Sequence, residues 1–207
     1  MLSRDSRWLA EAELVIFSIK NLLAVILAFI GDKYGFFAEF TKPLREVKIA
    51  VVEGAPGFAV VTQRQQGFEA ALTEAGIKFA IVSSQPSDWT PDSGEQICAN
   101  ALTANPDLDM IFSHADDMAL GCAKAIADAG SKAPLVATGG GSALGAVAIQ
   151  NGEFAASVCT QPGMIGELAG KVLQEAAVDP AAAKKGQYVT YDMVALTKEN
   201  VDSCPAW

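Results

Sequence analysis

The pattern of apolar and polar positions becomes regular from about residue 48 onward. Short apolar runs closed by glycine, proline or polar residues predict strands, and segments with apolar side chains at helical spacing predict helices between them. The predicted strands cover residues 48–53, 78–83, 110–114, 134–138, 155–160 and 187–196, and the predicted helices cover residues 62–76, 93–106, 116–130, 142–152 and 164–177.

The predicted strands are continuously apolar, and almost every one is followed by a helix. Both features are typical of a parallel sheet that is covered on its two faces. The sequence therefore predicts an α/β fold, a doubly wound parallel sheet with flanking helices. Local signals support the helix ends, with Asp116 and Ser142 as predicted N-caps and Gly130 at a C-terminus.

Residues 1–47 have a different character. The run LVIFSIKNLLAVILAFI at residues 14–30 is about as long as the shortest membrane-spanning helices, although Lys20 near its middle disfavours insertion. Two interpretations stay open, an uncleaved membrane anchor and a helix covered by protein. We therefore expect three parts: an atypical N-terminal segment (1–47), an α/β domain (48–200) and a C-terminal tail (201–207).

Charge and cysteine content limit the classes of function. A formal net charge of −9 and an isoelectric point near 4.6 argue against a nucleic-acid partner. The four cysteines are far apart, without the spacing of a zinc site. Cys98 and Cys122 fall in apolar helical patterns, which favours buried, unpaired thiols, although a disulfide among the four is an alternative that the sequence cannot assign.

Ligands of open parallel sheets bind at the carboxyl ends of the strands, so the residues that follow each strand are candidates. These positions carry an arginine, a tryptophan, a histidine, glycines, an amide and hydroxyls. A forked guanidinium and an indole face suit a small polyhydroxylated molecule. The candidates along the chain are Arg64, Trp89, His114, Thr138, Gly139–Gly141, Thr160 and Gln161.

Motifs for catalysis and for cofactor binding are absent from this sequence. The run GGGSALG does not match a dinucleotide-binding fingerprint or a phosphate-binding loop, and Ser142 is not in a nucleophile elbow. His114 with two nearby acids supplies too few ligands for a metal. We therefore expect no enzyme activity, no cofactor and no metal site.

Four segments give the chain a recognisable resemblance: RQQGFEAAL, SSQPSDW, NPDLDMIFSHADDMALGCAKAI and NGEFAASVCTQP. In this order and spacing they resemble the type I periplasmic sugar-binding proteins, the ribose-binding-like solute receptors of ABC importers. The resemblance covers residues 48–200 and matches mainly the family's C-terminal lobe, with the N-terminal lobe largely missing. It implies two lobes that close on a sugar.

Two candidate residues match the family's binding positions directly. Arg64 falls on the sugar-binding arginine, and Trp89 falls where the family stacks an aromatic ring on the sugar. The resemblance therefore implies a sugar or polyol ligand, and permease components of an ABC transporter as partners. It also implies a location in the periplasm or cell envelope, with membrane association through residues 14–30 as an alternative.

Three other positions depart from the family's pattern. Ala115 replaces an asparagine, for which His114 is a substitute, and Gly140 replaces an aspartate. Thr160 replaces a glutamine, with Gln161 adjacent. The predicted ligand-binding residues are Arg64, Trp89, His114, Asp116, Gly140, Thr160 and Gln161. Two other functions stay open, a membrane-anchored sugar-sensing domain and the effector domain of a LacI-like regulator.

Overall fold

A parallel sheet forms the middle layer of the computed structural model, which describes residues 46–179, 191–205 and 207. Its strands pair in the order β2-β1-β3-β4. A fifth strand, β5, continues the parallel order through bridges from Val136 to Ala156 and from Gly140 to Cys159. The strands are β1 (Val47–Glu53), β2 (Phe79–Pro86), β3 (Met110–Ser113), β4 (Leu135–Ala137) and β5 (Ser157–Cys159).

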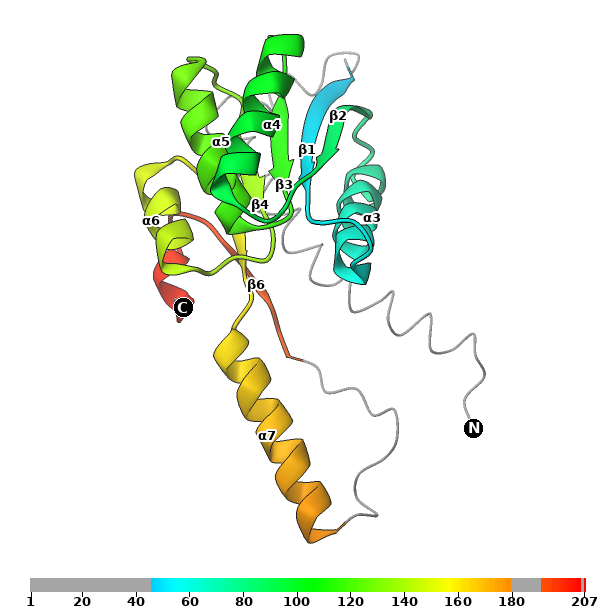
Figure 1. The fold of residues 1–207 in the computed structure, drawn as a ribbon, viewed down its shortest axis with the longest axis vertical. Coiled ribbons are helices and arrows are strands. Elements are labelled where there is room, and N and C mark those ends of the chain that lie inside the picture. The colour runs from blue at the N-terminus through cyan, green and yellow to red at the C-terminus, as the bar shows by residue number, and fades with distance from the viewer. Residues whose placement is uncertain (1–45, 180–190, 206) are drawn as a thin grey trace, which may run out of the picture.

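Helices cover both faces of the sheet, which confirms the predicted doubly wound fold (Figure 1). Helix α3 (Ala59–Glu74) packs Phe68 and Leu72 against one face. Three helices cover the opposite face, where Met118 and Ile149 join a second apolar core. These are α4 (Pro91–Ala104), α5 (Asp116–Asp128) and α6 (Ala143–Asn151).

The last strand departs from the expected parallel order. β6 (Val194–Leu196) pairs antiparallel with β5, and residues 187–190 of the predicted strand lie outside the described residues. The chain leaves β5 at the carboxyl edge of the sheet and comes back to the sheet from that same side. A strand that enters from that side must run in the opposite direction.

Two of the predicted helix ends are confirmed and one is wrong. The Ser142 side chain accepts a hydrogen bond from the Gly145 N–H, as an N-cap does. Gly130 has φ +60° directly after the end of α5. The N-cap of α5, however, is Ala115, without a side-chain bond, and Asp116 is already the first helical residue. The Asp116 carboxylate is engaged elsewhere, as described below.

The expectation of unpaired cysteines is also wrong. Cys98 bonds to Cys122 and joins α4 to α5, while Cys159 bonds to Cys204 and joins β5 to the C-terminal segment. The first pair forms because α4 and α5 approach closely at Gly94 and Gly121, where an added Cβ would overlap the backbone of the facing helix. Sequence spacing carries no sign of this contact.

Helix α7 (Pro162–Val178) extends away from the sheet and its covering helices (Figure 1). None of its residues is buried, and it exposes Met164, Ile165, Leu173 and Val178. Within the described ranges, no helix is long and apolar enough to cross a membrane. The predicted apolar helix at residues 14–30 lies outside the described residues.

Candidate functional site

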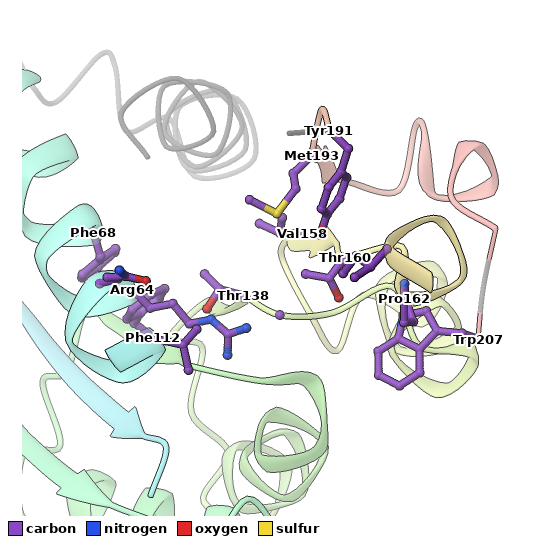
Figure 2. Close-up of a pocket in the computed structure, with 14 residues that line it drawn as sticks. Arg64, Phe68, Phe112, Thr138, Val158, Thr160, Pro162, Tyr191, Met193 and Trp207 are labelled. Carbon is purple, nitrogen blue, oxygen red and sulfur yellow. The ribbon is translucent and has the colours of Figure 1, made fainter. Parts of the chain in front are cut away.

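A pocket of about 620 Å³ opens at the carboxyl edge of the sheet (Figure 2). Its size falls in the range of small-molecule sites. Apolar side chains make up most of the wall, with a few polar groups among them. The lining residues come from α3, the ends of β3, β4 and β5, the start of α7, the chain around β6, and the C-terminal segment.

Arg64 is the charged residue of the pocket wall, and α3 carries it toward the ends of β3 and β4. Its Nη1 donates a hydrogen bond of 2.5 Å to the His114 carbonyl oxygen. The guanidinium also lies across Gly139, where φ is +64° and an added Cβ would overlap it. Burial lowers the pKa of Arg64, but an arginine stays charged at neutral pH. The Arg64 guanidinium is therefore held in place by contacts with the protein.

Trp89 lies on the other side of Arg64, outside the pocket lining. Its indole covers Gly54 at the end of β1, which leaves no room for a Cβ there. The Arg64 Cζ lies 6.0 Å from the ring centroid, within cation–π range. Phe58 meets the indole edge-on, with 6.5 Å between ring centroids, and is 59% exposed. Phe58 and Trp89 thus form an aromatic pair next to the guanidinium.

His114 is fully buried behind the pocket wall. Its Nδ1 accepts a hydrogen bond from the Gly54 N–H at 3.4 Å, and Nε2 lies 3.3 Å from Oε1 of Gln65, an arrangement that suits the Nε2–H tautomer. Burial, followed by the charge of Arg64, lowers the pKa of His114 to about 4. The imidazole is therefore neutral at pH 7. The backbone carbonyl of His114 holds Arg64 and accepts from Thr138 Oγ1 at 3.3 Å.

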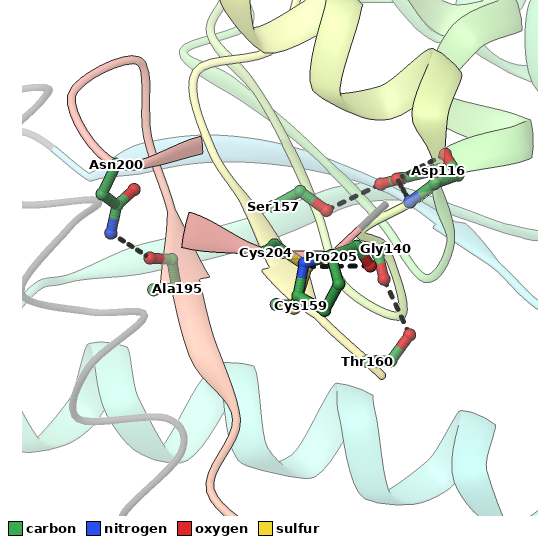
Figure 3. Close-up of a disulfide and its surroundings, with 10 residues drawn as sticks. Asp116, Gly140, Ser157, Cys159, Thr160, Ala195, Asn200, Cys204 and Pro205 are labelled. Atoms are coloured by element: carbon green, nitrogen blue, oxygen red, sulfur yellow. Dashed lines mark hydrogen bonds between the residues drawn. A yellow bond between two sulfur atoms is a disulfide. The ribbon is translucent and has the colours of Figure 1, made fainter. Parts of the chain in front are cut away.

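Asp116 is buried as well, with 2% of its surface exposed. Its carboxylate accepts hydrogen bonds from Ser157 Oγ at 2.6 Å, from Ser142 Oγ at 2.9 Å, and from the Ser142 N–H at 3.3 Å (Figure 3). Burial raises the pKa of Asp116, and these hydrogen bonds oppose the rise. The carboxylate therefore ties α5 to the loop after β4 and to β5.

The structure gives the three remaining candidates different positions. Gly140 is buried, and its carbonyl oxygen accepts hydrogen bonds from Thr160 Oγ1 at 2.7 Å and from the Thr160 N–H at 3.0 Å. Thr160 lines the pocket. Gln161 is half-buried at the start of α7 and does not line it. Of the seven predicted residues, the structure brings Arg64 and Thr160 to the pocket wall.

Several lining residues were not predicted as ligand-binding residues. Thr138 and Gly139 follow a strand and were noted in that position, whereas the others carry no local signal. The chain around β6 and the C-terminal segment reach the pocket only through non-local pairing, so sequence spacing could not find them. The unpredicted lining residues are Val60, Gln63, Phe68, Phe112, Thr138, Gly139, Val158, Pro162, Ile165, Tyr191, Met193 and Trp207.

In the part of the chain that the structure describes, no group of three His, Cys, Asp or Glu side chains could hold a metal ion. The donors at the pocket are a guanidinium, hydroxyls and an amide. This donor set is suited to hydrogen bonding with a ligand that carries several oxygen atoms.

Comparison with known proteins identifies a family. The model of the periplasmic binding protein domain matches residues 20–181. The ribose import binding protein of Salmonella typhimurium is 34% identical over 131 residues, which are 61% of this chain and 44% of that protein. The D-allose-binding periplasmic protein of Escherichia coli is 30% identical over 146 residues, or 70% and 45%. The chain thus spans about half the length of these relatives.

Solved structures agree on the fold. An ABC transporter periplasmic solute-binding protein from Actinobacillus succinogenes, solved with bound D-allose, superimposes with a TM-score of 0.70 at 23% sequence identity. The match covers 92% of this chain and 60% of that chain. The fold of the described lobe is therefore that of a periplasmic solute-binding protein.

Proposed function

Because this chain belongs to the periplasmic binding protein domain family, we propose that it binds a sugar or polyol as the substrate-binding component of an ABC-type sugar importer. Members of this family bind substrates and are not enzymes. The relatives named above bind ribose and D-allose according to their names. The chain covers only about half of each, so the ligand and the transporter are proposals for this protein.

The observation that carries the proposal is the fixed position of Arg64 at the pocket wall. Its guanidinium is held by the His114 carbonyl at the pocket wall, and the hydroxyl-bearing residues Thr138 and Thr160 line the same pocket (Figure 2). A preorganised donor fork beside hydroxyls binds the oxygens of a sugar without a large ordering cost. The apolar remainder of the wall suits the C–H faces of the ring.

We assign different roles to the other predicted residues. Trp89 supports the guanidinium from outside the pocket and, with Phe58, forms an aromatic pair beside it. The buried His114 and Asp116 position the wall from behind, and Gly140 holds Thr160 through its carbonyl oxygen. Gln161, the N-cap of α7, is still proposed as a contact for the sugar.

The proposal includes a periplasmic or cell-envelope location and recognition by permease components. Two disulfides suit an oxidising compartment. The exposed apolar residues of α7 suit contact with a second lobe that would close on the sugar, as the resemblance implies. The bond from Cys159 to Cys204 supports extending the proposed α/β domain beyond residue 200.

Calorimetric titration of the 207-residue chain with D-ribose, D-allose and D-galactose tests the proposal. We expect saturable binding of at least one sugar. Arg64→Ala should raise its Kd about 10- to 100-fold, since a hydrogen bond to a charged group contributes about 1.5–3 kcal/mol. Thr160→Val should raise the Kd by a smaller factor.

Lys132→Ala is the matched control, because Lys132 is exposed in the loop between α5 and β4, at the opposite edge of the sheet. It should leave the Kd unchanged. Absence of binding by protein with a folded circular-dichroism spectrum would refute the proposal, as would binding that neither Arg64→Ala nor Thr160→Val weakens.

A further inference from the structure

The C-terminal segment returns to the pocket after β6. It passes through a 3-10 turn, η1 (Val201–Ser203), and reaches Cys204, which is bonded to Cys159 at the end of β5 (Figure 3). Cys159 is followed directly by Thr160 of the pocket wall. The disulfide therefore fixes the C-terminal segment next to a strand end that contributes to the site.

Backbone hydrogen bonds continue this attachment as far as Trp207. The Trp207 N–H donates to the Gly141 carbonyl oxygen at 3.4 Å, and the Trp207 carbonyl oxygen accepts from the Ala143 N–H at 3.0 Å. Gly141 is in the left-handed region at φ +90°, and a Cβ there would lie 2.9 Å from Cys204 Sγ. The close approach of the two segments at this point thus depends on a glycine.

The Trp207 side chain lines the pocket and is 53% exposed. In Figure 2 it lies beside Pro162, across the pocket from Arg64. The indole, held by its backbone hydrogen bonds, therefore presents an exposed aromatic surface at the pocket wall. Such surfaces bind the apolar face of a ligand, and a sugar ring has one.

We propose that Trp207 is an aromatic contact for the bound sugar and that the Cys159–Cys204 disulfide is the tether that positions it. This inference rests on the proposed function and deepens it. The residue that the resemblance assigns to stacking, Trp89, packs instead against Gly54 and below Arg64. Trp207, by contrast, lines the pocket itself.

The tether has a physical reason. Ordering a mobile side chain when a ligand binds reduces the affinity, so a side chain that is already held in place binds with less cost. A disulfide three residues before Trp207 removes most of that freedom before the ligand arrives. Loss of the bond should therefore weaken binding even though neither sulfur touches the ligand.

The test compares sugar affinities by calorimetry, using the sugar that the wild-type chain binds among D-ribose, D-allose and D-galactose. Trp207→Ala should raise the Kd about 3- to 10-fold, which corresponds to the contribution of an aromatic contact. Trp207→Phe should restore most of the affinity, because it keeps a ring at this position.

The two disulfides provide a matched pair of variants. Cys159→Ala/Cys204→Ala should raise the Kd by a factor similar to that of Trp207→Ala, and combining the two changes should add little. Cys98→Ala/Cys122→Ala removes a disulfide that lies between α4 and α5, away from the pocket, and should leave the Kd unchanged.

An unchanged Kd in Trp207→Ala, with binding still sensitive to Arg64→Ala, would overturn this inference and leave the proposed function standing. Equal weakening by both disulfide variants would overturn the tether. No sugar binding by the wild-type chain would refute the proposed function, and the role of Trp207 with it. If Cys159→Ala/Cys204→Ala does not fold, the Trp207 variants still test the aromatic contact. Failure to fold would also show that this disulfide is needed for the fold, which contradicts a role limited to positioning Trp207.

Discussion

The carboxylate of Asp116 fills the space that a side chain at residue 140 would need. A Cβ added to Gly140 would overlap Oδ1 of Asp116 and Oγ of Ser157. These two atoms are themselves hydrogen-bonded at 2.6 Å and buried. The resemblance places an aspartate at this position in the family, whereas in this protein the Asp116 carboxylate from α5 occupies the space.

Gly140→Ala should therefore destabilise the fold by about 1–3 kcal/mol, because the added methyl group overpacks a buried site. Gly140→Asp should cost more, since it also buries a second carboxylate beside Asp116. Urea unfolding at pH 7 measures both effects. Gly163→Ala is the control, because nothing lies within 4 Å of the Cβ that it adds in α7. Wild-type stability in Gly140→Ala would contradict this packing.

Asp116→Asn should lower the free energy of unfolding by about 1–3 kcal/mol. The amide keeps one acceptor and places two donors among hydroxyl and N–H groups that now donate to the carboxylate. Asp117→Asn, one residue further on, changes the same chemistry at an exposed position and should have little effect.

Hydrogen exchange gives a second readout for Asp116→Asn. The Ser142 N–H donates to the carboxylate at 3.3 Å, so its exchange should accelerate in this variant and not in Asp117→Asn. Equal exchange rates in the two variants would show that the network does not hold the loop.

The burial of His114 predicts a pH dependence of stability. Its folded-state pKa of about 4 lies below the usual value of 6.5, so the unfolded chain binds the proton more readily. Stability from the neutral imidazole is complete above pH 6.5 and is lost as the pH falls toward 4. Urea unfolding at pH 7, 6 and 5 should show this loss.

His114→Gln is the variant that isolates the imidazole, because this is the chain's one histidine. It should lose less stability than the wild type between pH 7 and pH 5. Carboxylates titrate in both proteins and cancel in the difference. Parallel pH profiles would mean that the imidazole titrates normally and is not buried neutral.

The two disulfides should contribute unequally to stability. Each closes a loop of the unfolded chain, with sequence separations of 24 residues for Cys98–Cys122 and 45 for Cys159–Cys204. Removing either pair by alanine substitution should lower the free energy of unfolding by about 2–4 kcal/mol. The loss should be about 0.6 kcal/mol larger for the disulfide that closes the longer loop. Urea unfolding of the two double variants measures the difference, and a larger cost for the shorter loop would contradict the loop-entropy account.

The strands and helices could be predicted from the sequence because each depends on neighbouring residues. The predicted strands at residues 48–53 and 110–114 contain the apolar runs 49–52 and 110–112, and β1 and β3 appear there within one residue. The cap at Ser142 and the glycine after α5 are equally local. Arg64 and Thr160 could be nominated because the carboxyl ends of parallel strands meet at one edge.

Other features depend on contacts between distant segments. Asp116 has the sequence signature of an N-cap, yet its carboxylate turns to Ser157, 41 residues away. His114 occupies a candidate position at a strand end, but its side chain is enclosed by Gly54 and Gln65 from other elements. A short polar side chain has several partners within reach in a folded chain, and only packing selects among them.

The α/β architecture, the family resemblance and the edge of the sheet at which the pocket opens could be read from the sequence alone, because hydrophobic periodicity and turn residues act over short distances. The tertiary structure decided the pairing of the four cysteines, the buried position of Asp116 and the arrival of Trp207 at the pocket. Each of these requires segments tens of residues apart to meet, and no local pattern records which segments become neighbours.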